Sequence, residues 1–106
     1  MATYTRRLAA AAPGAAGDAI LLTVPATGTY VVRDVSAVHF SLARVDALFQ
    51  LYIAGAAQVT IASHMALTAY EVFRWDGRQV LLPGELLVAN MSAAPWSVVV
   101  TGYVFD

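Results

Sequence analysis

The sequence predicts an all-β fold, an antiparallel β-sandwich or jelly roll of about eight short strands. Three observations support this prediction. Short runs of apolar and β-branched residues recur along the chain. Turn formers such as Pro-Gly, Asp-Gly and single Gly residues separate these runs at intervals of about 8 to 12 residues. Several runs also alternate between apolar and polar side chains, which is the period of a half-buried strand.

Each expected strand is an apolar or alternating run that ends at a turn former. In chain order these runs are residues 19–24, 30–35, 37–42, 48–54, 58–62, 69–75, 79–82, 86–90 and 96–105. Residues 41–52 also have helical spacing, but their β-branched and aromatic types favour a strand over 48–54. Residues 8–12 are compatible with one helical turn or with a loop.

Two dipeptides predict tight turns near the end of the chain. Asp76-Gly77 is typical of a hairpin, because Gly adopts positive φ without a Cβ clash. Pro83-Gly84 predicts a type II turn, with Pro at its second position and Gly at its third. We expect residues 1–18 to form an N-terminal arm and residues 19–106 to form a single β-sandwich domain.

The composition predicts contact with partner subunits. Hydrophobic residues make up 59% of the chain and charged residues 12%, against about 25% charged in an ordinary soluble domain. A small domain with so few charges exposes apolar surface, and large apolar patches mark interfaces. All six cationic residues are Arg, so Lys, a common protector of sheet edges, is missing. A monomer with an Ala-rich surface is the alternative.

Charge and composition also argue against several classes of partner. The net charge is −1 and the pI is about 6.0, whereas nucleic-acid binders show a basic stripe. There is no Cys for a disulfide framework or a thiolate zinc site. Every apolar run is interrupted before the roughly 20 residues that a spanning helix needs. We therefore expect no nucleic acid and no membrane as partners.

The sequence contains no convincing catalytic or metal-binding pattern. A catalytic zinc site needs about three protein ligands, and the two histidines, His39 and His64, have no ligand-like spacing. We expect His39 to lie opposite the core face of its strand and His64 to lie in a loop. No GxSxG or phosphate-binding loop occurs, and a catalytic pair among Glu71, Asp76 and Glu85 is disfavoured. We expect no enzyme, no cofactor and no metal.

Five residues are candidates for an interface: Arg6, Arg7, Trp75, Arg78 and Trp96. The Arg6-Arg7 pair has no acidic neighbour in sequence, so it is either solvated or free to bind a partner's carboxylates. The two tryptophans stand at strand ends, which favours core or interface packing over a platform for carbohydrate. The remaining arginines are expected to pair locally or across an interface, namely Arg33 with Asp34, Arg44 with Asp46, and Arg74 and Arg78 with Asp76.

The string FRWDGRQVLLPGELLV, followed by VVVTGY, resembles small β-sandwich virion proteins of tailed bacteriophages, especially those of actinobacteria. The earlier VPATGTYVVRDV resembles their first turn and strand. The chain departs from the pattern at Thr101, where Ser is usual, and at Trp96, where a polar residue is usual. The matching positions are Gly77, Arg78, Val80, Gly84, Glu85, Leu87, Thr101, Gly102 and Tyr103.

The resemblance implies a structural role in a virion and transfers no catalytic residue. The first expectation is a capsid decoration protein that forms a homo-oligomer, such as a trimer, and contacts the major capsid protein. A tail or baseplate accessory subunit is the second expectation. Two further hypotheses remain open, a carbohydrate-binding module with Trp75 or Trp96 exposed beside a groove, and a small cupin-like enzyme with His39 and His64 on a metal.

Overall fold

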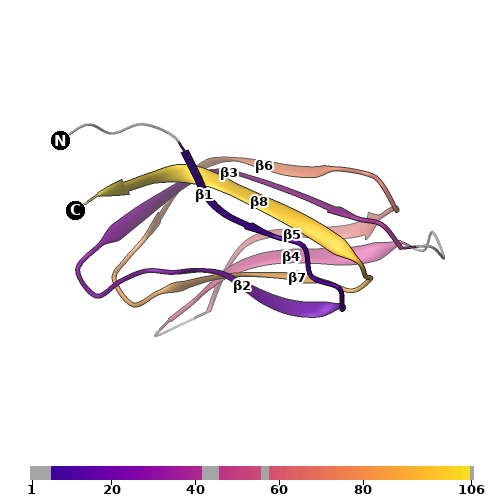
Figure 1. Cartoon of the computed structure of the whole chain (residues 1–106), viewed down its shortest axis with the longest axis horizontal. Coiled ribbons are helices and arrows are strands. Elements are labelled where there is room, and N and C mark those ends of the chain that lie inside the picture. Colours follow the sequence, from indigo (N-terminus) through magenta and orange to yellow (C-terminus); the bar gives the residue numbers. More distant parts are fainter. Residues whose placement is uncertain (1–5, 42–45, 56–57, 106) are drawn as a thin grey trace.

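The computed structural model describes residues 6–41, 46–55 and 58–105, without the side chains of Arg6, residues 64–66 and residue 105. The described chain forms two antiparallel four-stranded sheets that lie face to face (Figure 1). The first sheet has the order β1 (Arg6–Ala11), β8 (Trp96–Phe105), β3 (Thr29–His39), β6 (Phe73–Leu81). The second has the order β2 (Gly17–Thr23), β7 (Leu86–Met91), β4 (Ala47–Ala54), β5 (Val59–Leu67).

This strand order defines an eight-stranded jelly roll. Successive strands alternate between the two sheets over most of the chain, so that β1, β3, β6 and β8 form one layer and the other four strands form the second. The first strand pairs with the last, since β1 lies antiparallel to β8. The predicted all-β sandwich is confirmed, and the jelly roll is the form that it takes.

The core lies between the two sheets and follows from the alternation of side chains along each strand. On β4 the buried and less buried positions alternate strictly, and Phe49, Leu51 and Ile53 face inward. From the opposite sheet, Val35 and Val100 are fully buried in the same cluster. These apolar contacts are the main stabilising term, at roughly 25 cal/mol for each Å² of apolar surface removed from water.

Several predicted elements have different limits in the structure. The two runs at 30–42 form one strand, β3, because β8 pairs with it continuously from Thr29 to His39 apart from one register shift. Residues 8–12 are not helical, since β1 runs to Ala11 within the expected arm. Residues 69 and 70 form a turn, so β6 begins only at Phe73. The preferred strand over 48–54 is confirmed by β4, and residues 42–45 lie outside the described residues.

The two predicted turns have opposite outcomes. Pro83-Gly84 is confirmed, because the amide of Glu85 donates to the carbonyl of Leu82 at 3.1 Å and Gly84 has a φ of 83°. Asp76-Gly77 is not a hairpin turn, since both residues lie inside β6. Pairing of β6 with β3 along most of its length outweighs the local preference of this dipeptide for a turn.

The strands of the first sheet do not use equal numbers of residues to cover the same distance. Val32 and Val35 of β3 each have a paired residue on β8 and on β6. Between these two sets of paired residues lie one residue on β8, two on β3 and three on β6. β1 also shifts register here, at Leu8. Such bulges bend and twist a sheet and re-aim side chains. The residues between these two sets are Thr101 on β8, Arg33 and Asp34 on β3, and Asp76, Gly77 and Arg78 on β6.

Gly102 lies at the closest approach of two backbones beside this row of bulges. It is buried on β8 and pairs with Val32 of β3 and with Arg6 of β1. A Cβ atom placed on Gly102 would overlap the carbonyl oxygen of Val31 and lie 3.0 Å from Cδ1 of Leu8. Because a backbone oxygen cannot rotate away as a side chain does, only glycine fits this position.

We predict that Gly102→Ala lowers the free energy of unfolding by about 3 kcal/mol or more, because the new methyl group forces β3 away from β8. Gly14→Ala is the matched control, since no atom lies within 4 Å of its added Cβ, and it should change stability by less than about 0.5 kcal/mol. Chemical denaturation followed by circular dichroism measures both. Equal stability of the two variants would contradict the close approach at Gly102.

Candidate assembly surface

A cluster of charged side chains lies on the outer face of the first sheet, where the bulges occur. Five of the chain's 13 charged residues (six Arg and seven Asp or Glu) gather there. We call this group the charged cluster. Its members are Arg33 and Asp34 on β3 and Arg74, Asp76 and Arg78 on β6.

Arg74 is paired with both carboxylates of the charged cluster. Its Nη2 lies 3.6 Å from Oδ2 of Asp34, and its Nε lies 3.6 Å from Oδ1 of Asp76. Asp34 and Asp76 are direct cross-strand partners, so this guanidinium also offsets the repulsion between two like charges. The Arg74 side chain is 63% exposed, and ion pairs this open to water contribute only about 0–1 kcal/mol to stability.

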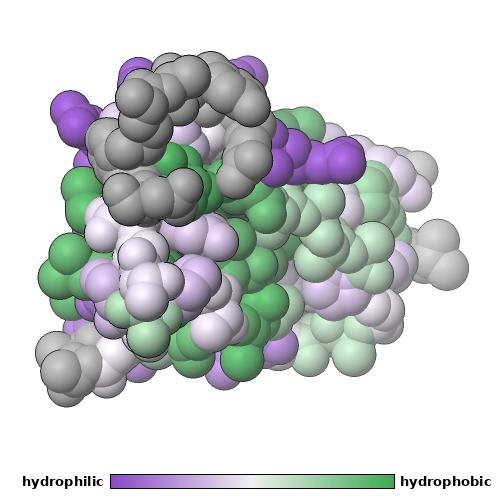
Figure 2. Space-filling view, turned by 60° about the vertical axis from the view of Figure 1, so that its left-hand side comes forward, coloured by the Kyte–Doolittle hydropathy of each residue, from purple (hydrophilic) through white to green (hydrophobic). Residues whose placement is uncertain are grey.

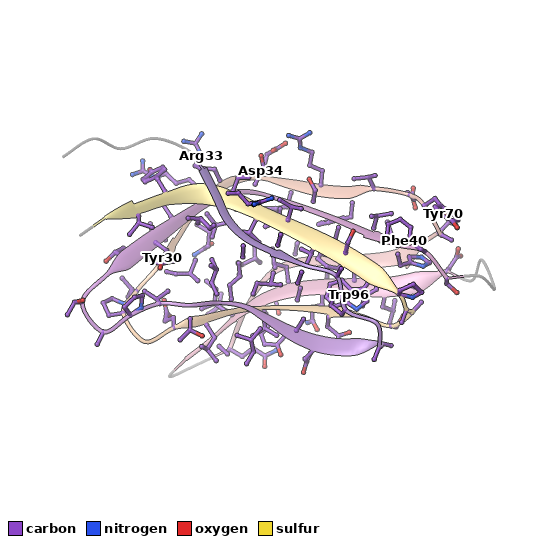
Figure 3. All side chains as sticks on the ribbon, in the orientation of Figure 1. Tyr30, Arg33, Asp34, Phe40, Tyr70 and Trp96 are labelled. Atoms are coloured by element: carbon purple, nitrogen blue, oxygen red, sulfur yellow. The ribbon has the colours of Figure 1, made fainter. Side chains whose placement is uncertain are left out.

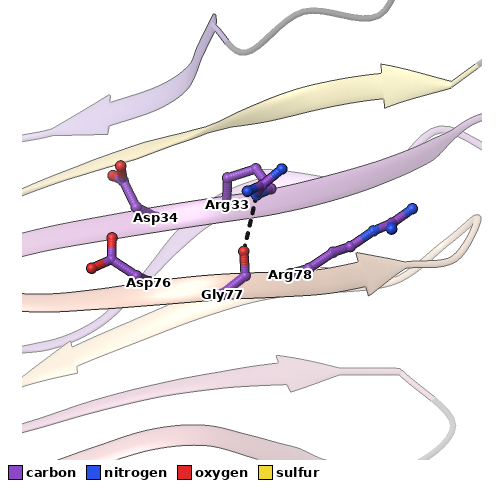
Figure 4. Close-up of a pocket in the computed structure, with 5 residues that line it drawn as sticks. All are labelled: Arg33, Asp34, Asp76, Gly77 and Arg78. Carbon is purple, nitrogen blue, oxygen red and sulfur yellow. Dashed lines mark hydrogen bonds between the residues drawn. The ribbon is translucent and has the colours of Figure 1, made fainter.

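Arg33 and Arg78 have a different arrangement from the expected local ion pairs. The Nε of Arg33 donates to the carbonyl oxygen of Gly77 at 3.0 Å, which fixes the side chain across the two strands (Figure 4). Arg78 is exposed on β6 two residues beyond Asp76. The expected pairing of Asp76 with Arg74 is present, whereas Arg44 lies outside the described residues.

All members of the charged cluster except Arg74, together with Gly77, line a surface depression of about 760 Å³. Figure 4 shows that the charges are separated along the strand direction. The two carboxylates, both paired with Arg74, lie at one end; Arg33 lies beside Gly77, and Arg78 lies toward the other end. The depression is therefore a bipolar surface rather than a uniformly basic or acidic one.

This arrangement suits recognition better than catalysis. Guanidinium groups bind carboxylates and other oxyanions through paired hydrogen bonds, while carboxylates accept hydrogen bonds from a partner's cations. No nucleophile with an adjacent base lines the depression. Within residues 6–41, 46–55 and 58–105, no three His, Cys, Asp or Glu side chains converge as a metal site would require.

The arginines predicted for an interface lie at opposite edges of the first sheet. Arg7 is exposed on β1 and pairs with Thr101, which in turn pairs with Asp34 on β3. Arg78 is exposed on the other edge strand, β6. The backbone of Arg6 pairs with Gly102, while its side chain is outside the described part of the chain. Arg7 and Arg78 are thus available to a partner but are not brought together.

The two predicted tryptophans lie in very different surroundings. Trp96 is 1% exposed, belongs to the core, and donates its indole N–H to the carbonyl of Ala15 at 3.1 Å (Figure 3). This burial removes Trp96 from the side chains that a partner or a sugar could contact. Trp75 is half-buried and packs against the core from β6, next to the space that a side chain on Gly77 would need.

The expectations for the two histidines require correction. His39 faces the core rather than the opposite side of β3, because it follows Val35 and Ala37 in the alternation of that strand. It is fully buried, with its Nε2 2.6 Å from the carbonyl oxygen of Leu67. His64 is on strand β5 instead of in a loop, where its backbone pairs with Phe49.

The outer face of the second sheet has polar side chains that bind one another. Nδ2 of Asn90 donates to Oδ1 of Asp18 at 2.8 Å, across β7 and β2. Partial burial, and then the charge of Asp18 and a hydrogen bond to it, raise the pKa of Tyr52 above its ordinary value. Asp18 therefore interacts with both Asn90 and Tyr52 on this face of the sheet.

Large apolar side chains are exposed at several places around the sandwich. Figure 2 shows hydrophobic surface across much of the view, interrupted by smaller hydrophilic areas. At one end, the ring of Tyr70 is 57% exposed and packs edge-on against Phe40, with ring centroids 5.6 Å apart (Figure 3). Tyr70 also has a φ of 66°, which is uncommon for a residue with a side chain. The most exposed aliphatic residues are Ile20, Val72, Leu82 and Val59.

Three comparisons with known proteins were made. No family model and no curated protein matches the chain. Among solved structures, this chain is similar to a chain in the structure of infectious bursal disease virus of the Gx strain. The TM-score is 0.49 and the sequence identity 13%, and the match covers 97% of this chain and 31% of the viral chain. The VP2 subviral particle of the same virus gives a TM-score of 0.45 at 13% identity, over 97% and 32% of the two chains.

The chain therefore spans about a third of the length of each of these viral chains. The jelly-roll assignment rests on the strand order of the two sheets. The described part of the chain contains no helix that is long and apolar enough to cross a bilayer.

Sequence reasoning did not identify Arg33, Asp34 and Asp76 as part of the candidate surface. A usable signal was present, because the sequence places Arg-Asp in one expected strand and Arg-Trp-Asp-Gly-Arg in another. In a chain with only 12% charged residues, two such concentrations are conspicuous. Their proximity depends on the pairing of β3 with β6, which the sequence does not state.

We predict that Trp96→Ala lowers the free energy of unfolding by about 3–5 kcal/mol, because a large buried ring and its hydrogen bond are lost. Tyr70→Ala removes an exposed aromatic ring and should cost no more than about 1.5 kcal/mol. Urea denaturation of the two variants beside the parent chain measures the difference. A loss of less than about 1 kcal/mol for Trp96→Ala would show that the ring does not support the core.

Proposed function

We propose that this chain is a structural subunit of a virus particle, and more narrowly a capsid decoration protein of a tailed bacteriophage. The observation that carries the proposal is the distribution of the surface residues. Charges are concentrated on one face of the first sheet, while Ile20, Val72 and Leu82 are each more than half exposed. Partner subunits that covered these side chains would remove apolar surface from water and so stabilise an assembly.

The jelly roll alone is compatible with viral capsid, lectin and cupin-type domains, so the residues must distinguish these classes. A cupin-like metal site on both histidines would require His39 to give up its hydrogen bond to Leu67 and to open to solvent. A lectin-like platform on Trp96 would require a buried ring to become exposed. A structural subunit requires neither change, which favours the virion role.

The positions that resemble phage virion proteins have structural roles here, which also supports the proposal. Gly102, within VVVTGY, accommodates the carbonyl of Val31. Gly84, within PGE, adopts the positive φ of its turn, and Oε1 of Glu85 accepts the amide of Leu82 at 2.7 Å. The resemblance therefore concerns how the sandwich is built, as expected for proteins that share a scaffold and act through contacts between subunits.

The edges of the second sheet offer a second route for such contacts. The edge strand β5 has the sequence VTIASHMAL, which contains no Asp, Glu, Lys or Arg. The opposite edge strand, β2, has one charged residue, Asp18. Uncharged edges of this kind accept an added strand from a neighbouring chain, and a neighbour in a particle would cover them.

The copy number of this chain in purified particles tests the proposal. Quantitative mass spectrometry, calibrated on the major capsid protein of the same particles, should find hundreds of copies if the chain decorates the capsid. A number in the low tens or below would assign it to the tail or baseplate as an accessory subunit. Its absence from particles would contradict the virion role and favour a free binding module.

A further inference from the structure

We propose that the outer face of the first sheet is a self-association surface, on which two copies of this chain pack face to face. A two-fold axis crosses the strands between the two ends of the charged cluster. Arg33 and Arg78 of each copy then lie over Asp34 and Asp76 of the other. This inference rests on the proposed function, because it identifies one of the subunit contacts through which a particle protein would act.

Positive and negative charges are unevenly distributed along the strands within the charged cluster. Asp34 and Asp76, with Arg74 paired to both, give one end of the cluster a formal charge of −1, whereas Arg33 and Arg78 give the part toward the other end a charge of +2 (Figure 4). A two-fold axis across the strands reverses the strand direction of the second copy and so places each basic end over an acidic end. The same patch thus complements itself, as an isologous interface requires.

Arg33 and Arg78 both have N–H groups available to a second copy. The Nε of Arg33 is held by the carbonyl of Gly77, which leaves the two Nη groups of this fork to a partner. Arg78 is exposed and forms no ion pair with any carboxylate in the described part of the chain. Both guanidinium groups can therefore bind a second copy without giving up an ion pair of their own, and the carboxylates that they meet are shared with Arg74 of that copy.

Exposed side chains beside the charged cluster add apolar contacts to the same interface. Val80 is 41% exposed at the basic end, and Arg74 is 63% exposed at the acidic end. The same two-fold axis brings Arg74 of one copy over Val80 of the other, where its aliphatic stem covers the valine. Val99, 38% exposed on β8, adds apolar surface. The apolar contacts supply affinity, and the charges determine the register.

A second copy fits this surface better than a partner of one charge. With three arginines and two aspartates, the charged cluster has a formal charge of +1. A purely acidic partner would meet Asp34 and Asp76, and a purely basic partner would meet the arginines. Edge-to-edge pairing through β6 is also disfavoured, since its bulge and its three charged residues disturb the regular ladder.

Two charge reversals on the full chain test the proposal. In the two-fold arrangement Arg78 of one copy faces Asp76 of the other, so Arg78→Asp and Asp76→Arg each create two like-charge contacts. Each variant alone should self-associate at least about tenfold more weakly than the parent chain. An equimolar mixture should recover association to within about threefold of the parent, because the new aspartate of one chain meets the new arginine of the other.

Sedimentation velocity from micromolar to hundreds of micromolar protein measures these constants, and association of the parent chain should weaken as salt is raised. Asp46→Arg, an exposed position outside the charged cluster, is the control and should associate like the parent. Circular dichroism confirms that each variant is folded. If Arg78→Asp unfolds, Arg78→Glu repeats the test with a longer side chain on the same strand.

Three results would overturn the proposal: a parent chain that is monomeric throughout, single variants that associate like the parent, or a mixture that stays dissociated. A monomeric parent whose attachment to particles is weakened by Arg78→Asp but not by Asp76→Arg would assign the surface to an acidic virion partner instead. Copy number in particles is measured independently. A monomeric chain found in hundreds of copies would therefore reject the self-association surface and leave the proposed function standing.

Discussion

The close contact between β8 and β3 at Gly102 is the constraint on which the first sheet depends. Where the Val31 carbonyl lies against a residue without a side chain, β8 follows the shortest path and the strands toward the β6 edge need extra residues. Those extra residues are mostly charged, since the outer face at this level meets water. The close approach at Gly102 and the bulges that carry the charged cluster therefore lie next to each other in the first sheet.

Features that depend on nearby residues could be predicted from the sequence, and features that depend on pairing between distant strands could not. The turn at Pro83-Gly84 needs only its own two residues and is present as expected. Asp76-Gly77 has an equally strong local preference for a turn, yet β3 holds both residues in a continuous strand. Strand register is decided by the burial of whole faces, so a local signal is overruled where a long partner strand is available.

In the candidate surface, too, local features could be predicted from the sequence, whereas features that depend on strand pairing could not. Arg7 and Arg78 are exposed and their role at an interface stays a prediction, whereas Trp96 shows that an aromatic residue at a strand end can close the core. The pairing of Arg74 with two carboxylates depends on the register of β3 against β6. The sequence predicts the wrong face for His39, because both alternating sets of residues along β3 contain apolar side chains and either set could face inward.

The pairing of β1 with β8 has a consequence for how the protein is made. Arg6 and Gly102 are cross-strand partners, so the ladder of β1 cannot form until β8 has been synthesised. Contacts between such distant residues raise the contact order and slow folding. Until β8 is synthesised, β1 and β3 both expose unpaired edges rich in alanine and valine. The nascent chain is therefore open to wrong association at these edges until β8 emerges.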